Sequence, residues 1–285
     1  MKITLLSAVL LLLAATLWAQ RSQVRELKMT SAILGVEKEL SVYLPAGYEN
    51  STRSYPVLYL LHGASDDHRA WLQKGNVKTI ADEAIAGGAS LPVIIVMPDA
   101  SGEGEQRTGL NMGYFNMQGW AYEDYFFREL IPFIDKTFRT LADKRHRAVA
   151  GLSMGGGGTT VYAQRHPEVF GSGCPMSALI TFSDRGNSTI RRNEQFVVSV
   201  DATDPLKFVR SATPAQIESM RSVRWLIDCG DDDHLLEGNL NIFMEMRRKN
   251  IPAELRVRNG AHNWNYWQVS LSSTLQFISV GFAGE

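Results

Sequence analysis

One serine in the sequence stands in a setting that suits nucleophilic chemistry. Ser153 is the centre of GLSMG, residues 151–155, which has the form G-x-S-x-G and lies between the apolar run HRAVAGL and a helix-compatible segment. Glycines on both sides permit a tight turn from strand to helix, which leaves the serine hydroxyl exposed. The pattern predicts a nucleophile, and the alternative is a serine that only caps the next helix. We expect glycines 156–158 to let that helix approach the sheet closely.

A serine hydroxyl needs a general base, which a third group must orient. The sequence has six histidines. Only His262, in NGAHNWNYW, follows the last apolar strand, where a loop can return to the edge that carries Ser153. His146 and His166 flank the serine strand and its helix, and His68 lies in a polar loop. We therefore expect His262 to be the base.

Three aspartates are candidates for the orienting group. Asp231, Asp232 and Asp233 come directly after the apolar run SVRWLIDCG. Spacing alone does not rank adjacent residues, and the alternative is a solvated turn that caps the next helix. A metal site in DDDH is disfavoured, because adjacent side chains point in different directions and no second ligand cluster stands out.

The tetrahedral intermediate of acyl transfer needs two N–H donors for its oxyanion. Met154 follows the nucleophile and supplies one donor. The second donor is expected from Ala64, which follows the HG pair in LYLLHGAS. The alternative for this segment is an ordinary turn at the end of a strand.

The elements that must position these residues follow an alternating pattern. Two β-rich runs, residues 24–30 and 37–44, predict an antiparallel hairpin at the start. Short strands that are apolar on both faces then alternate with helical stretches, which indicates an α/β fold with a mostly parallel sheet covered on both sides. No repeat or linker interrupts this pattern, so residues 20–285 are expected to form a single domain. The longest connection, residues 180–222, contains a predicted helix start at TPAQIESMRS.

The composition is that of a globular protein that is neither strongly acidic nor strongly basic. Apolar residues make up 45% of the 285 residues, and the net charge is −1. No block of like charges suggests a nucleic-acid or membrane partner. Residues 1–19 have a lysine, an apolar stretch and a small final residue, which predicts a cleaved signal peptide and a periplasmic or secreted protein. The two cysteines, Cys174 and Cys229, are expected to be buried free thiols.

Taken together, the motifs resemble the putative-esterase family of α/β-hydrolases, which includes esterase D and the feruloyl esterases. The resemblance runs from about residue 44 to 267 through YPVLYLLHG, YEDYFFRELIPFID, GLSMGGGG, CGDDDHLLEGN and GAHNWNYW. It implies an α/β-hydrolase fold with Ser153 as nucleophile and His262 as base. Its G-x-x-D-x-L motif implies Asp233 as the acid, and it implies Ala64 and Met154 as the oxyanion donors.

The expected function is that of a secreted serine esterase that works without a cofactor or metal. Trp71, Trp120 and Trp264 are candidates for stacking on a phenolic acid or a sugar, although core packing is the alternative for each. With export, they favour removal of feruloyl or acetyl groups from plant polysaccharide. Other interpretations are an acyltransferase, a short-chain acyl esterase without polysaccharide specificity, or a non-catalytic carbohydrate-binding protein.

Overall fold

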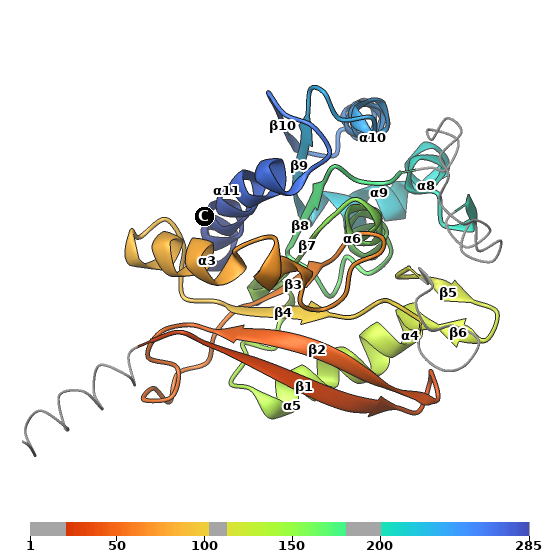
Figure 1. The fold of residues 1–285 in the computed structure, drawn as a ribbon. Helices are drawn as coiled ribbons and strands as arrows, with labels where there is room; N and C mark the ends of the chain where they lie inside the picture. The colour runs from red at the N-terminus through yellow and green to blue at the C-terminus, as the bar shows by residue number, and fades with distance from the viewer. Residues whose placement is uncertain (1–20, 103–112, 181–200, 285) are drawn as a thin grey trace, which may run out of the picture.

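The computed structural model describes residues 21–102, 113–180 and 201–284. These residues form one large sheet, with its eight strands in the order β1-β2-β4-β3-β7-β8-β9-β10 (Figure 1). The strands of this sheet are β1 (Gln23–Ser31), β2 (Val36–Leu44), β3 (Val57–Leu61), β4 (Ile94–Pro98), β7 (Arg147–Leu152), β8 (Ser172–Met176), β9 (Arg224–Gly230) and β10 (Glu254–Arg258). A separate small hairpin is formed by β5 (Asn116–Met117) and β6 (Trp120–Ala121).

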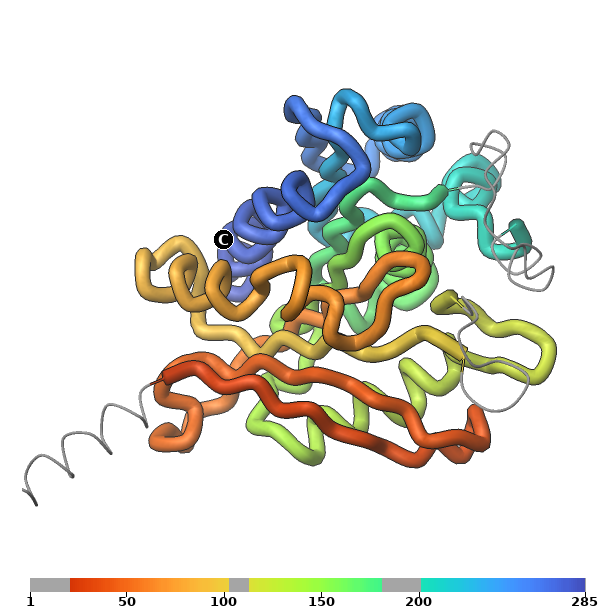
Figure 2. Tube along the Cα trace, in the orientation of Figure 1, coloured from red at the N-terminus to blue at the C-terminus, as the bar shows by residue number. Residues whose placement is uncertain are grey.

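The N-terminal hairpin forms one edge of the sheet. β1 and β2 pair antiparallel in a register that joins Gln23 to Leu44 and Ser31 to Val36. β2 then pairs antiparallel with β4, whereas the strands from β4 to β10 are parallel to one another. The chain therefore passes from the hairpin at one edge to β10 at the other (Figure 2). The predicted hairpin and the predicted mostly parallel sheet are confirmed.

Helices cover both faces because the central strands are apolar on both sides. On β3, Val57, Tyr59 and Leu61 belong to one core cluster, and Leu58 and Leu60 belong to the other. The first cluster lies under α4 to α6 and α8 to α10, and the second lies under α2, α3 and α11. The helices are α2 (Ala70–Gln73), α3 (Val77–Ala86), α4 (Tyr122–Tyr125), the π-helical η1 (Phe126–Leu130), α5 (Ile131–Thr137), the 3-10 helix η2 (Lys144–His146), α6 (Met154–Arg165), α8 (Pro205–Ser211), α9 (Pro214–Arg221), α10 (Leu236–Arg248) and α11 (Trp264–Ala283).

Part of the long connection between β8 and β9 is helical, as predicted. Thr213 caps α9, its hydroxyl accepts from Gln216 N at 3.3 Å, and the Gln216 side chain accepts from Thr213 N at 2.8 Å. This reciprocal pair satisfies two backbone donors that a helix start would otherwise leave unpaired. Residues 181–200 of the connection, like the predicted signal peptide of residues 1–19, lie outside the described residues.

Both cysteines are buried and free, as predicted. Burial raises the pKa of the Cys229 thiol to about 12, so that this group is an apolar packing element rather than a nucleophile. Across the described ranges, none of the helices has the length and apolar character that crossing a membrane requires.

Candidate active site

Ser153 occupies a strained turn between β7 and α6. Its backbone angles are φ 54° and ψ −115°, a conformation that costs a residue with a side chain on the order of 1–3 kcal/mol. Three hydrogen bonds hold it there: Ser153 N donates to Met176 O at 3.0 Å, and Ser153 O accepts from Gly157 N at 3.0 Å and Leu179 N at 2.9 Å. Neighbouring segments on both sides of the turn therefore fix the direction of the serine side chain.

The glycines of α6 allow its first turns to lie against backbone. A Cβ on Gly156 would come within 2.7 Å of Met176 O, in β8. A Cβ on Gly157 would come within 2.4 Å of Leu179 O, in the segment that follows β8. Both distances are shorter than any real contact, so the expected close approach of this helix is confirmed.

His262 and Asp233 form a continuous hydrogen-bonded line with Ser153. His262 Nε2 lies 3.0 Å from Ser153 Oγ, and His262 Nδ1 lies 2.9 Å from Asp233 Oδ2 and 3.0 Å from Oδ1. The Asp233 side chain is fully buried, whereas the His262 side chain is 19% exposed. The three residues follow the carboxyl ends of β7, β9 and β10, and these parallel strands end on the same side of the sheet.

The electrostatic environment keeps Asp233 ionised. Burial by itself raises the pKa of this carboxyl, but hydrogen bonds from His262, Leu235 N and the Ser177 hydroxyl outweigh it, and the pKa of Asp233 is lowered from its usual value. An ionised Asp233 accepts a hydrogen bond from the N–H of His262 Nδ1. Nε2 is then the unprotonated nitrogen that faces Ser153. The arrangement suits proton transfer from the serine.

The structure separates the three adjacent aspartates. Asp233 bonds His262, while Asp231 Oδ1 accepts from Gly260 N at 2.8 Å. Asp232 is exposed, and only its backbone N–H is used, as a donor to Gly260 O at 3.0 Å. Asp231 and Asp232 thus tie the end of β9 to the loop that carries His262, and the Asp233 carboxylate alone contacts the imidazole.

Two side chains, Ser177 and Trp267, support this line, and the sequence predicted that role for neither of them. Ser177, with φ 44°, directly follows β8, and its hydroxyl accepts from Trp267 Nε1 at 3.0 Å. The Trp267 ring packs edge-on against His262, with centroids 4.9 Å apart and planes at 89°. Trp267 therefore packs against the His262 imidazole. It also donates a hydrogen bond to Ser177, whose hydroxyl interacts with Asp233. Nothing in CPMSAL predicts the left-handed backbone of Ser177.

The HG loop lies directly against Ser153. A Cβ on Gly63 would lie 2.6 Å from Leu152 Cδ1 and 3.6 Å from Ser153 Cβ, so the loop after β3 packs on the serine turn. Within the described residues, neither Ala64 N nor Met154 N donates a hydrogen bond. Both amides are available for a ligand, and Met154 begins α6, whose N-terminus favours negative charge.

A buried polar network holds this loop from behind. His62 Nδ1 contacts Gly63 O at 2.8 Å, and His62 Nε2 accepts from Ala100 N at 2.9 Å, so the proton resides on Nδ1. Asp99 Oδ1 lies 3.5 Å from His62 Nε2, and Asp99 Oδ2 accepts from the buried Lys38 Nζ at 3.1 Å. Burial raises the pKa of Asp99, but the charge of Lys38 and hydrogen bonding from the Ser101 hydroxyl hold it well below its usual range.

The predicted aromatic residues have different surroundings. Trp71 and Trp120 are each 1% exposed, and Trp71 Nε1 donates to Leu61 O at 3.0 Å. A ring so covered presents no open face to a ligand, which favours the packing role for both. Trp264 is half-buried and packs edge-on against Trp71 and Trp267, with centroids at 5.2 and 5.3 Å. It is the candidate that remains accessible, and it connects to His262 through Trp267.

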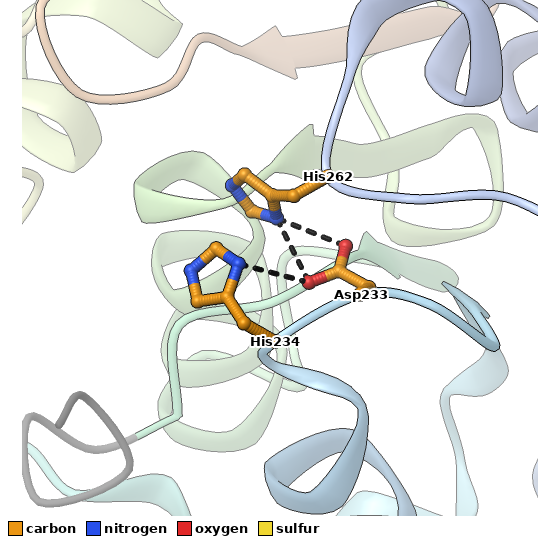
Figure 3. A group of neighbouring side chains, drawn as sticks. All are labelled: Asp233, His234 and His262. Atoms are coloured by element: carbon orange, nitrogen blue, oxygen red, sulfur yellow. Dashed lines mark hydrogen bonds and ion pairs between the residues drawn. The ribbon is translucent and has the colours of Figure 1, made fainter.

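One group of side chains within the described ranges has the spacing of metal ligands. Asp233, His234 and His262 each offer a ligand atom, and these atoms lie within 4.8 Å of one another (Figure 3). The other four histidines have partners elsewhere: His62 with Gly63 and Ala100, His68 with Ser41, His146 with Asp143 and His166 with Glu123. His234 is the histidine of the DDDH segment, for which the sequence alone disfavoured a metal site.

Comparison with known proteins identifies the family of the chain. The sequence model of the family described as "Putative esterase" matches residues 31–278. The chain belongs to this esterase family. This esterase is 38% identical to a solved ferulic acid esterase, which it matches with a TM-score of 0.86 over 92% of its own length and 99% of that chain. The α/β-hydrolase fold and the similarity of this family member to a ferulic acid esterase are thereby established.

Curated relatives include larger proteins. An endo-1,4-beta-xylanase/feruloyl esterase of Xylanibacter ruminicola is 39% identical over 152 residues, which are 52% of this chain and 20% of that protein. An esterase of Mycobacterium tuberculosis is 35% identical over 182 residues, which are 64% of this chain and 35% of that protein. The esterase thus spans between about a fifth and a third of the length of these two relatives.

Proposed function

We propose that this esterase hydrolyses carboxylic esters through an acyl-enzyme on Ser153, with His262 as general base and Asp233 as the orienting acid. The observation that carries the proposal is the continuous line from Ser153 Oγ through both nitrogens of His262 to Asp233, with contacts of 2.9 and 3.0 Å. A serine next to an oriented imidazole is the arrangement that activates a hydroxyl for attack on a carbonyl.

In the first step, Ser153 Oγ attacks the ester carbonyl while its proton passes to His262 Nε2. The resulting imidazolium is stabilised by ionised Asp233, and the amides of Met154 and Ala64 donate to the oxyanion. His262 then gives the proton to the leaving alcohol, and the acyl group stays on Ser153. In the second step, water enters, His262 takes its proton, and collapse of the second intermediate releases the acid and regenerates Ser153.

We further propose that the acyl group is feruloyl or acetyl on plant polysaccharide, and that residues 20–285 form one esterase domain that is exported after removal of residues 1–19. Relatives named feruloyl esterase and xylanase/feruloyl esterase support the substrate class. The partly open Trp264 ring, close to His262 through Trp267, suits a phenolic acyl group. The signal-like composition of residues 1–19 supports export.

A hydrolysis panel tests this function. The purified protein and its Ser153→Ala variant are compared on methyl ferulate, p-nitrophenyl acetate, acetylated xylan and feruloylated arabinoxylan, with free acid measured by chromatography. The proposal expects hydrolysis of methyl ferulate and release of ferulate from arabinoxylan by the wild type only. Equal rates for the two proteins on every ester would refute the proposed mechanism, and activity confined to p-nitrophenyl acetate would refute the proposed substrate class.

A further inference from the structure

His234 is a second imidazole beside the proposed catalytic pair that the acyl-transfer steps do not use. It immediately follows Asp233, and its ring packs against His262 with centroids 4.5 Å apart and planes at 62°. His234 Nδ1 lies 3.7 Å from Asp233 Oδ1 (Figure 3). The His234 side chain is 56% exposed, so the group can be reached from solvent.

The ligand atoms of this group have the chemistry and separations of a transition-metal site. Two imidazoles and a carboxylate form a set that Zn²⁺ uses in proteins, with metal–ligand bonds of about 2.0–2.2 Å and a water in the fourth position. A tetrahedron with such bonds places its ligands roughly 3.3 Å apart. The observed separations from Asp233 Oδ1 are 3.0 Å to His262 Nδ1 and 3.7 Å to His234 Nδ1, on either side of that value. Small side-chain rotations bring all three to a metal ion.

We propose that Asp233, His234 and His262 bind Zn²⁺, or another borderline divalent ion such as Cu²⁺, and that the bound ion reversibly inhibits the esterase. Binding requires only these three side chains, whereas inhibition rests on the proposed function of His262. Mg²⁺ prefers six oxygen ligands and is not expected to occupy the site.

The inhibition follows from the position of one proton. In the line described above, neutral His262 carries its proton on Nδ1 and keeps Nε2 unprotonated toward Ser153. A metal ion on Nδ1 takes the lone pair of that nitrogen, loses a water, and leaves the single proton of the neutral imidazole on Nε2. The protonated Nε2, 3.0 Å from Ser153 Oγ, then cannot accept the serine proton. The metal also replaces the hydrogen bond to Asp233, so the ion blocks catalysis without filling the space of the substrate.

Two measurements test the site. Zn²⁺ binding to the Ser153→Ala variant is measured by isothermal titration calorimetry in a non-chelating buffer, because this variant keeps all three ligands and needs no activity. One ion per chain is expected, and His234→Gln in the same background should weaken binding by more than about tenfold, since even outer partners of a metal site contribute roughly 10- to 100-fold. His146→Gln is the matched control, because His146 pairs with Asp143 at 2.8 Å but lies outside this group.

Inhibition is then measured on p-nitrophenyl acetate, with each protein normalised to its own rate without metal. Zn²⁺ should inhibit the wild type and His146→Gln equally, EDTA should restore both rates, and His234→Gln should need more than about tenfold more Zn²⁺ for the same inhibition. Equal binding by His234→Gln and its parent would overturn the site. Binding without inhibition of an active wild type would overturn the inhibitory role. An enzyme without esterase activity would contradict the proposed function, while calorimetry would still decide the metal site.

Discussion

Replacing Asp233 by asparagine gives a sharp test of how the acid orients the base. Asp233 Oδ1 accepts from Leu235 N at 2.8 Å, so the carbonyl oxygen of an asparagine keeps that position. The amide nitrogen must then take the place of Oδ2, which lies 2.9 Å from His262 Nδ1. An NH₂ group there donates to Nδ1 and forces the proton of His262 onto Nε2, the nitrogen that faces Ser153.

The size of the effect depends on which loss dominates. Loss of a hydrogen bond to a charged group alone costs about 1.5–3 kcal/mol, which corresponds to roughly 10- to 200-fold in rate. The wrong tautomer removes the base as well, and in serine hydrolases this change lowers kcat on the order of 10⁴-fold. Because the Leu235 bond fixes the orientation of the amide, we expect the larger value for Asp233→Asn.

The neighbouring aspartates supply matched controls for this variant. Asp232 is exposed, so Asp232→Asn should leave kcat unchanged, and Asp231→Asn keeps an oxygen for Gly260 N and should lose less than about tenfold. The assay is kcat on p-nitrophenyl acetate, with circular dichroism melting to verify folding. A kcat of a folded Asp233→Asn variant within tenfold of wild type, or a larger loss of kcat in Asp231→Asn, would show that Asp233 does not orient His262.

Three further changes test other parts of the site. Lys38→Met leaves Asp99 buried without its cation and should cost about 3–5 kcal/mol in urea unfolding at pH 7. Because the folded pKa of Asp99 is lowered, that contribution is present above about pH 4 and is lost as the pH falls through the folded pKa, so a difference that stays constant in acid would contradict it. Gly157→Ala brings a Cβ within 2.4 Å of Leu179 O and should cost about 1–3 kcal/mol of unfolding free energy, with reduced kcat; a neutral effect on both would refute the packing argument. Trp264→Ala should raise KM for methyl ferulate by roughly three- to tenfold and leave that for p-nitrophenyl acetate nearly unchanged, and equal effects on both esters would argue against stacking.

The fold and the turn that carries Ser153 were readable from the sequence because their signals are local. Alternation in the hairpin and unbroken apolar strands have direct structural meaning, and a serine between glycines after such a strand marks one turn. His262 was identifiable because one histidine alone follows the last strand. The structure also brings Asp233 to His262. Spacing alone could not distinguish Asp233 from Asp231 and Asp232, whereas the family motif did.

The remaining features depend on contacts between distant segments. Lys38 stands between two glutamates in β2 and reads as a solvent-facing residue, yet it is fully buried against Asp99, 61 positions away. The burial of Trp71 and Trp120 depends likewise on what packs over them, and composition cannot distinguish a covered indole from an open one. The left-handed backbone conformation at Ser177 occurs at a non-glycine residue, so the sequence does not predict it.

Whether Ser153 is the nucleophile can be measured with a fluorophosphonate reagent. Such a reagent phosphonylates a serine that a neighbouring base activates, and mass spectrometry of the digested protein locates the adduct. We expect one adduct per chain, on Ser153, that forms in parallel with the loss of esterase activity and is absent from Ser153→Ala. An adduct on another residue, or full activity in protein whose Ser153 is labelled, would contradict it.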